Sequence, residues 1–422
     1  MKTYNLIVIG GGSAGMASAL EAYGNGIKDI LILERENDLG GILLQCIHSG
    51  FGLEIFKHEL TGPEYADLFK QEIIKKNIKY KLNTVVLSIN DKKEIIYTNE
   101  EEGYVSIKAK AIILASGCQE RNRGHILLPG DRPSGIMTAG LAQKYLNIDG
   151  YLVGKKVFIL GSGDIGLIMA RRMTLEGAKV LGVAELMPYS NGLNRNIVQC
   201  LKDYDIPLYL SHTVTNIYGK EHLERIEISK VDENLKPIKG TEMYFDCDTL
   251  LLSVGLVPSN ELLASIGVKK NLATKGSFVN ESLETSIDGI FSCGNSLHVH
   301  DLVDFVTKEA RRAGQNASKY IKGELKNTTD EITVSYDKNI GYILPNVIHL
   351  ANIDKNIVFN YRVRKPLKNI KINIYFNDTL IKTLKKPYML PAEMEELVLN
   401  KELFNSTVGN IRVEIEETLW KN

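Results

Sequence analysis

One glycine-rich turn constrains the fold of this chain more than any other feature, because it occurs twice. In the first copy the apolar stretch YNLIVIG leads into Gly10-x-Gly12-x-x-Gly15, a helical pattern follows, and a second apolar stretch, DILILE, ends at Glu34. One glycine permits the tight turn, one lets the backbone approach a pyrophosphate, and one lets helix and strand pack closely. The helix N-terminus favours the phosphate charge. Glu34 is placed to accept hydrogen bonds from ribose hydroxyls.

The second copy keeps the spacing of the first. Gly161 and Glu185 are 24 positions apart, as are Gly10 and Glu34. Two unrelated accidents with identical spacing are improbable, so both copies are predicted to bind a dinucleotide. The candidate cofactor ligands are Gly10, Gly12, Ser13, Ala14, Gly15 and Glu34 in the first copy, and Gly161, Gly163, Asp164, Ile165, Gly166 and Glu185 in the second.

The duplication continues beyond the turns. Each copy is followed by short alternating strand candidates and then by an apolar strand that ends in glycine, KAIILASG and CDTLLLSVG. This order of elements describes a doubly wound α/β domain. The closing strands add four candidate cofactor ligands, namely Ala115, Ser116, Gly117 and Gly255.

Length and composition exclude several classes of protein. A chain of 422 residues predicts two or three domains. The 51 basic and 51 acidic residues cancel, so we expect neither nucleic acid nor an anionic membrane as a partner. No apolar run approaches the roughly 18 residues of a membrane span, and the apolar stretch near the N-terminus is too short for a signal peptide. The five cysteines lie at least 46 positions apart, which argues against a zinc knuckle, an iron–sulfur cluster or a disulfide framework. We therefore expect a cytoplasmic protein without a metal site.

With these motifs, residues 1–325 resemble the two-dinucleotide-binding-domain flavoproteins of the pyridine nucleotide–disulfide oxidoreductase class. GLVPSN is similar to a turn of that family, and TSIDGIFSCGN is similar to its second flavin segment, with Gly294-Asn295 in place of Gly-Asp. Asn295 can hydrogen-bond the ribityl chain but lacks the charge. The resemblance implies that the first fold binds FAD and that the second, inserted into the first, binds NAD(H). The implied domains are 1–120 with 248–325 for FAD and 121–247 for NAD.

Two details concern the nucleotides. Glu185 favours NAD(H) over NADP(H), because a carboxylate bonds a 2′-hydroxyl but repels a 2′-phosphate. A helical pattern begins at about Asp301, and the family resemblance implies that its N-terminus points at the flavin pyrimidine. His298 and His300 precede it, and two readings stay open: loop histidines that cap or face solvent, or a role with flavin or substrate.

The last part of the chain departs from the family. Over residues 328–422 apolar residues alternate with polar ones, for example at Ile370, Ile372 and Ile374. This period predicts a small all-β, sandwich-like domain. Disulfide reductases of the class carry a mixed α/β dimerisation domain there, so the oligomeric state, homo- or hetero-oligomer, stays open.

Cys46 is the single catalytic candidate. In disulfide reductases a glycine pair is followed by C-x-x-x-x-C. Here the glycine pair ends at Gly41, which is a further candidate cofactor ligand. The two cysteine positions counted from this pair hold Leu43 and His48, which excludes that dithiol. If residues 41–49 are helical, Cys46 and His48 point to different faces. A packing role for Cys46 is therefore favoured over a redox role.

Four further stretches, LGGILLQCIHSGFGL, ELTGPEYA, ASGCQER and GDRPSGIMTAG, resemble a narrower group. These are FAD/NAD-dependent oxidoreductase subunits related to the alpha subunits of opine oxidase, hydroxyproline dehydrogenase and hydrogen cyanide synthase. The resemblance implies hydride exchange between NAD(H) and bound flavin, and electron transfer to or from a partner flavoprotein dehydrogenase subunit or a small acceptor. Two alternatives stay open: a single-cysteine NADH oxidase, peroxidase or disulfide reductase that uses Cys46, and a non-catalytic flavoprotein scaffold.

Overall fold

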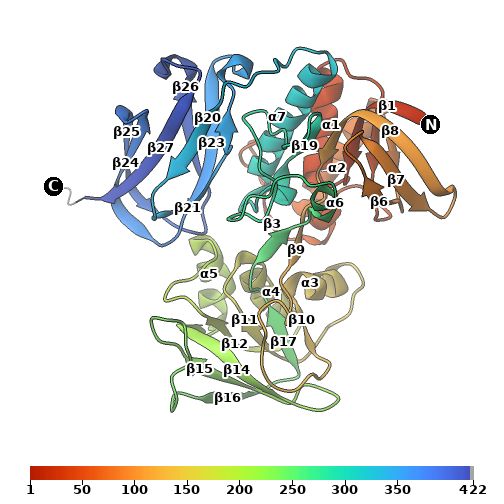
Figure 1. Ribbon diagram of the computed structural model, residues 1–422. Helices are drawn as coiled ribbons and strands as arrows, with labels where there is room; N and C mark the ends of the chain where they lie inside the picture. The colour runs from red at the N-terminus through yellow and green to blue at the C-terminus, as the bar shows by residue number, and fades with distance from the viewer. Residues whose placement is uncertain (419–422) are drawn as a thin grey trace. The chain divides into compact units, whose positions relative to one another are not determined.

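The computed structural model describes residues 1–418 and divides them into two compact units (Figure 1). Unit 1 contains Met1–Cys118 and the chain from Pro258 onward, and unit 2 contains Gln119–Val257. The second unit is thus inserted into the first. The chain returns to unit 1 later than the expected position 248, because strand β17 (Thr249–Leu252) pairs in parallel with strands of unit 2. None of the helices in residues 1–418 is long and apolar enough to cross a membrane.

A seven-stranded sheet forms the centre of unit 1. Its order is β5-β2-β1-β8-β7-β6, with β19 also paired to β8; β5, β2, β1, β8 and β19 run parallel, and β7 and β6 add an antiparallel meander. Leu6 and Val8 pack on the helices of one face, and Ile7 and Ile9 pack in the core of the other. These strands are therefore apolar throughout, as buried parallel strands must be. The bounds are β1 Lys2–Ile9, β2 Ile30–Leu33, β5 Lys79–Lys81, β6 Val85–Ile89, β7 Glu94–Asn99, β8 Gly103–Leu114 and β19 Ile290–Ser292.

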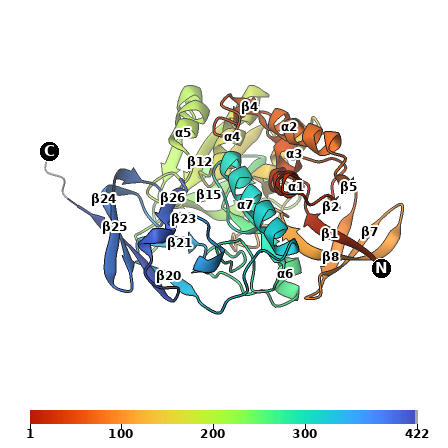
Figure 2. The same cartoon turned by 90° about the horizontal axis from the view of Figure 1, so that it is seen from above.

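Three long helices cover one face of this sheet. Helices α1 and α7 lie side by side (Figure 2), and α7 begins at Val303, two positions after the expected start. Helix α2 starts with a capping box, in which the Thr61 hydroxyl and the Glu64 carboxylate satisfy each other's backbone N–H groups. The bounds are α1 Ser13–Gly24, α2 Gly62–Lys75, α6 Glu261–Ser265, α7 Val303–Ile321, η1 Gly41–Gln45, η3 Gly294–Ser296, β3 Ser49–Phe51 and β4 Leu60–Thr61.

Unit 2 repeats the same plan with fewer strands. Five parallel strands run in the order β10-β17-β11-β12-β13, and a separate antiparallel sheet has the order β14-β15-β16. The connecting segments form a two-stranded ribbon, β9 (Cys118–Glu120) with β18 (Leu256–Pro258). The bounds are β10 Ile136–Thr138, α3 Ala139–Asn147, β11 Lys156–Leu160, α4 Asp164–Leu175, β12 Lys179–Glu185, α5 Asn194–Cys200, η2 Lys202–Tyr204, β13 Leu208–Leu210, β14 His212–Tyr218, β15 Arg225–Lys230 and β16 Met243–Asp246.

The remainder of unit 1 is a β-sandwich, as the alternating pattern predicts. One sheet has the order β22-β20-β27-β24-β25 and the other β21-β23-β26. The inward residues of both, such as Ile370, Ile372 and Phe359, form one buried core. Asn377 and Asp378 both have positive φ and make the tight turn between β24 and β25. The bounds are β20 Ile332–Tyr336, β21 Ile340–Leu344, β22 Val347–Ile348, η4 Leu350–Asn352, β23 Asn356–Val363, β24 Leu367–Phe376, β25 Thr379–Met389, β26 Glu395–Asn400, η5 Lys401–Leu403 and β27 Gly409–Glu417.

Candidate functional site

The first glycine turn is packed so closely that side chains are sterically excluded. Gly10 has φ +101°, and a Cβ added there would lie 2.4 Å from the Ala115 carbonyl oxygen. A Cβ on Gly15 would lie 1.8 Å from the Gly10 carbonyl oxygen. These contacts let α1 approach the ends of β1 and β8, with the helix N-terminus at the turn.

Three segments far apart in the sequence meet at this turn. Gly12 forms an isolated bridge with Gly40, and a Cβ on Gly41 would lie 3.1 Å from the Gly12 Cα. A Cβ on Gly294 would lie 2.8 Å from the Ala14 Cβ. Backbone without side chains therefore lines the N-terminus of α1 on two sides, which is the kind of surface that a pyrophosphate requires.

Glu34 closes this turn at the end of β2. The residue is 5 % exposed; Oε2 accepts the Gly11 N–H at 2.5 Å and Oε1 accepts the Glu36 N–H at 2.9 Å. A carboxylate offers about four acceptor positions. The two protein hydrogen bonds therefore fix the carboxylate and leave capacity for ribose hydroxyls.

The second glycine turn, in unit 2, reproduces these contacts. A Cβ on Gly161 would lie 2.1 Å from the Ser253 carbonyl oxygen, as Gly10 meets Ala115 in unit 1. Glu185 Oε2 accepts the Ser162 N–H at 2.9 Å and its hydroxyl at 2.6 Å, and Oε1 accepts the Met187 N–H at 2.9 Å. Both acidic residues thus tie their strand to their own glycine turn. Three bonds on Glu185 leave about one acceptor position for a ribose hydroxyl.

Asp164 has a different partner from the one expected of a phosphate-binding residue. It begins α4, and its Oδ1 accepts hydrogen bonds from the Leu193 N–H at 2.8 Å and the Asn196 amide at 2.6 Å. The carboxylate thus holds the residues that start α5. The neighbouring Ile165 packs against the core of unit 2.

A cavity of about 660 Å³ opens in unit 2 beside the ends of β10 and β17. Its lining includes Thr138, Leu252, Arg132 and residues of the loop 122–130, among them Arg123. Ligands of open α/β sheets bind outside the carboxyl ends of the strands. The cavity therefore lies at the edge of the sheet where ligands of such sheets bind, and its lining does not include the second glycine turn.

The residues that follow the closing strands tie the connecting segments together. The Ser116 hydroxyl donates to the Ser259 carbonyl oxygen at 2.5 Å, and the Ser259 N–H donates to the Gly117 carbonyl oxygen at 3.0 Å. Gly255 has φ +100°, and its carbonyl oxygen accepts the Arg121 N–H at 2.9 Å.

Cys46 ends a helix shorter than the expected 41–49. The 3₁₀ helix η1 stops at Gln45, and Cys46 follows as its cap. The thiol donates to the Ile42 carbonyl oxygen at 3.3 Å, and a Cβ on Gly62 would lie 2.8 Å from the Cys46 Cβ. Burial raises the pKa of Cys46 to about 12. At neutral pH the residue is a protonated thiol, which is a poor nucleophile.

Asn295 lies where the resemblance placed a flavin contact, and it has two protein partners. Its Oδ1 accepts the His300 N–H at 3.0 Å, and its amide donates to the Cys118 Sγ at 3.7 Å. Sequence reasoning did not connect Cys118 with Asn295, because they are 177 positions apart.

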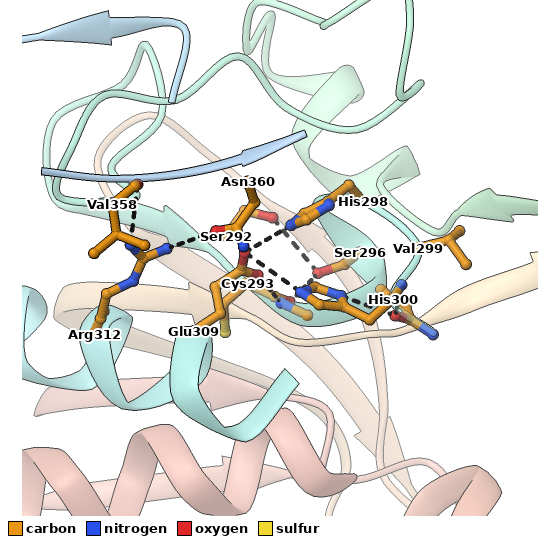
Figure 3. Close-up of polar contacts among 12 residues, drawn as sticks. Ser292, Cys293, Ser296, His298, Val299, His300, Glu309, Arg312, Val358 and Asn360 are labelled. Atoms are coloured by element: carbon orange, nitrogen blue, oxygen red, sulfur yellow. Dashed lines mark hydrogen bonds and ion pairs between the residues drawn. The ribbon is translucent and has the colours of Figure 1, made fainter. Parts of the chain in front are cut away.

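His298 and His300 form a buried cluster with Glu309 of α7 (Figure 3), so neither faces solvent. Burial, together with repulsion from His300, lowers the pKa of His298 to about 4. Burial favours the neutral form of Glu309, but the two imidazoles outweigh it and hold the pKa of Glu309 well below its usual value. Sequence reasoning missed Glu309. The signal was its spacing, three positions after Val306 and four before Ala313, which places it on the buried face of α7.

Two arginines join this cluster to the β-sandwich. Arg312 donates to the Val358 carbonyl oxygen at 3.3 Å (Figure 3), and burial lowers its pKa against the attraction of Glu309. Arg362 of β23 donates to Asp301 Oδ1 and to the Val299 carbonyl oxygen, each at 3.2 Å. Arg312 thus ties α7 to β23, and Arg362 ties the loop before α7 to the same strand.

Comparison with known proteins identifies the class. A family model described as "Pyridine nucleotide-disulphide oxidoreductase" matches residues 4–319, and the chain belongs to this family. It is therefore an FAD-dependent NAD(P)H oxidoreductase, as predicted.

Two curated relatives and one solved structure illustrate the similarity. The hydrogen cyanide synthase subunit HcnB of Pseudomonas protegens is 22 % identical over 293 residues, and the match covers 64 % of this chain but only 61 % of that subunit. An NADH oxidase of Methanocaldococcus jannaschii is 26 % identical over 350 residues, which cover 75 % of this chain and 70 % of that protein. The crystal structure of T. acidophilum thioredoxin reductase superposes with a TM-score of 0.61 at 22 % identity, over 76 % of this chain and 99 % of that one. The predicted resemblance to the group that contains subunits of hydrogen cyanide synthase and opine oxidase is confirmed.

Proposed function

We propose that this chain passes a hydride from NADH to FAD and hands the electrons to a partner protein or a small acceptor without a thiol relay. The observation that carries the proposal is the pair of equivalent glycine turns, each closed by a buried glutamate that keeps acceptor capacity for ribose. Two such turns in one chain are what an enzyme of this family needs for two nucleotides.

The first turn is proposed to hold FAD. The residues assigned to the pyrophosphate and ribose are those of the turn with Glu34, and Gly41 and Gly294 from the neighbouring segments. Asn295 is assigned to the ribityl chain as an uncharged hydrogen-bonding group. The close glycine contacts support the assignment, because any Cβ at Gly10 or Gly15 would collide with backbone. The full set for FAD is Gly10, Gly12, Ser13, Ala14, Gly15, Glu34, Gly41, Ala115, Ser116, Gly117, Gly294 and Asn295.

The second turn is proposed to hold NAD(H) in preference to NADP(H). Glu185 is 4 % exposed, and its carboxylate is fixed by the three hydrogen bonds described above. A 2′-phosphate there would meet a negative charge that cannot turn away. Asp164 is proposed to act indirectly, by holding the segment that begins α5. The full set is Gly161, Gly163, Asp164, Ile165, Gly166, Glu185 and Gly255.

The bound flavin would accept the hydride, that is, two electrons and one proton, from the nicotinamide. The task of the protein in this step is to bind and orient both rings and to exclude water from between them. Two observations argue against a thiol step. The sequence has no closely spaced cysteines, and the Cys46 thiol is protonated at neutral pH.

Two observations support the proposal of a protein partner: the similarity to HcnB, and exposed apolar side chains near the first glycine turn. HcnB is named as a subunit, so it acts within a larger assembly. In the present chain, Ile42 is 62 % exposed and Leu53 is 47 % exposed on the segment that follows Gly41. Apolar side chains of that size on the surface next to a cofactor loop suit a partner interface.

Flavin reduction tests the proposal. Protein purified with FAD is mixed anaerobically with NADH or NADPH in a stopped-flow instrument, and the flavin absorption band is followed. We expect NADH to bleach the band within milliseconds to seconds and NADPH to act more slowly. Reduction over minutes, or none with either nucleotide, would favour the scaffold reading.

The partner is tested separately. Affinity purification from the native host with wild-type protein and with the Ile42→Lys variant should recover a flavoprotein dehydrogenase subunit with the former and much less of it with the latter. Recovery of the same partner by both proteins would exclude this surface.

A further inference from the structure

The loop between η3 and α7 carries a compact group of metal-ligand side chains. His298 and His300 come from the loop, and Glu309 projects toward them from the second turn of α7 (Figure 3). The side chains are 0 %, 1 % and 4 % exposed. Two imidazoles and a carboxylate with almost no access to water need internal partners for every polar atom.

The three inward-facing atoms converge on one point. Nε2 of His298 lies 2.7 Å from Oε2 of Glu309, and Nε2 of His300 lies 3.5 Å from the same oxygen. All three atoms lie within 4.8 Å of one another. In the described part of the chain, Nε2 of His300 makes no hydrogen bond although it is buried. A buried ring nitrogen that makes no hydrogen bond is costly and calls for an explanation.

The outer atoms of the same side chains are anchored. Nδ1 of His298 lies 3.1 Å from the Tyr342 hydroxyl, and Nδ1 of His300 lies 3.2 Å from Oδ1 of Asn295. Oε1 of Glu309 accepts the Gly294 N–H at 2.7 Å. Each side chain is thus oriented by one atom so that its other atom faces the common point. Metal-binding histidines usually donate their other ring N–H to an oxygen atom, which fixes the orientation of the ring.

We propose that His298, His300 and Glu309 bind one zinc(II) ion through Nε2, Nε2 and Oε2. Two imidazoles and a carboxylate suit zinc, whereas magnesium and calcium prefer oxygen alone. With ligand bonds of about 2.1 Å, tetrahedral ligand atoms lie about 3.4 Å apart. The His300–Glu309 separation already fits, and the His298–Glu309 contact must widen by about 0.7 Å. His298 then donates its Nδ1–H to Tyr342, which leaves Nε2 unprotonated for the metal.

The spacing of the cysteines argues against a metal site built from cysteines. It says nothing about a site of histidines and a carboxylate that come together only in the fold. The proposal does not depend on NADH activity, because its readout is metal content. It adds a role for the loop that carries Gly294 and Asn295, since an ion on His300 would fix that loop to α7.

Zinc binding by the full-length FAD-loaded protein tests the proposal. The protein is purified without a polyhistidine tag, its zinc content is measured by mass spectrometry, and zinc is then removed with EDTA and titrated back by calorimetry. We expect about one zinc per chain and a single strong site. His300→Gln should weaken zinc binding by at least roughly 100-fold, and Tyr342→Phe, which leaves all three ligands in place, by about 10- to 100-fold.

His349→Gln is the matched control. His349 pairs with Glu281 at 3.2 Å, a histidine–carboxylate contact outside the proposed set. This variant should bind zinc as the wild type does. Absence of a strong zinc site in the stripped wild type would overturn the proposal, and so would equal affinities in His300→Gln and the wild type. If His300→Gln does not fold, Tyr342→Phe decides alone: unchanged affinity would count against the site.

Discussion

Replacing Cys46 by serine tests whether electrons leave the protein through a thiol. The thiol donates to the Ile42 carbonyl oxygen, and burial raises its pKa to about 12. At pH 7 the thiolate then amounts to roughly one part in 10⁵, and forming it costs about 7 kcal/mol. A relay that begins with this thiolate would carry that cost in every turnover. We therefore expect the residue to serve in packing only.

The serine variant keeps a donor near the same carbonyl group but has no sulfur nucleophile. We expect a loss of about 1 kcal/mol in the free energy of unfolding, seen as a fall in Tm of about 2 °C. NADH should reduce the flavin at the wild-type rate. Steady-state turnover with a quinone or dye acceptor should stay within about tenfold, which corresponds to about 1.4 kcal/mol of barrier.

The matched control is Cys200→Ser, because Cys200 is a buried thiol of unit 2 with a raised pKa of about 11. Both serine variants should behave alike in the acceptor assay. If Cys46→Ser loses more than about 100-fold in acceptor turnover while its flavin is still reduced normally, Cys46 is a relay. The single-cysteine oxidase or disulfide-reductase reading would then replace the one proposed here.

Three further outcomes follow from the geometry. Gly294→Ala should weaken FAD binding by at least about tenfold, because Gly294 has φ +67° and an added Cβ would lie close to Ala14. The loss is measured by the fluorescence of released FAD, and the control Gly323→Ala, at φ +73° with open space around it, should retain FAD. Glu185→Gln should raise KM for NADH by about tenfold and change KM for NADPH less. A wild type that already prefers NADPH would refute the assignment of Glu185. Glu185→Arg is a poorer test, because it would bury a guanidinium. Burial raises the pKa values of Cys200 to about 11 and Cys247 to about 12, so above about pH 9 the unfolded chain binds fewer protons than the folded one and stability falls as pH rises. A Cys200→Ala, Cys247→Ala double variant should show a flatter decline of Tm between about pH 8 and pH 10.5, and an identical decline would contradict the pKa assignments.

The features that local chemistry determines could be predicted from the sequence. The glycine turns were recognisable because tight backbone contacts tolerate no side chain, and the structure shows those contacts at Gly10 and Gly161. The sandwich was predictable from alternation alone, since Ile370, Ile372 and Ile374 all face one core. Both signals come from residues that are close to one another in the sequence.

The features that depend on distant partners could not be predicted. Residues 41–49 are expected to be helical, but the helix ends at Gln45. The Cys46 carbonyl oxygen accepts a hydrogen bond from the Gly62 N–H, a partner distant in the sequence. The sequence placed His298 in a loop without indicating its burial, because its partners Glu309 and Tyr342 lie on other elements. Helical spacing can indicate that Glu309 lies on the buried face of α7, but it does not indicate which distant residues meet it there.

The most direct test of the central claim is a kinetic isotope measurement on the first half-reaction. Flavin reduction is followed anaerobically with NADH and with NADH that carries deuterium at the transferred position of C4. We predict rapid bleaching of the flavin band and a clear slowing with the deuterated nucleotide, because that C–H bond breaks in the step observed. A flavin that stays oxidised with both nucleotides would contradict the claim that this chain transfers hydride from NADH to its FAD.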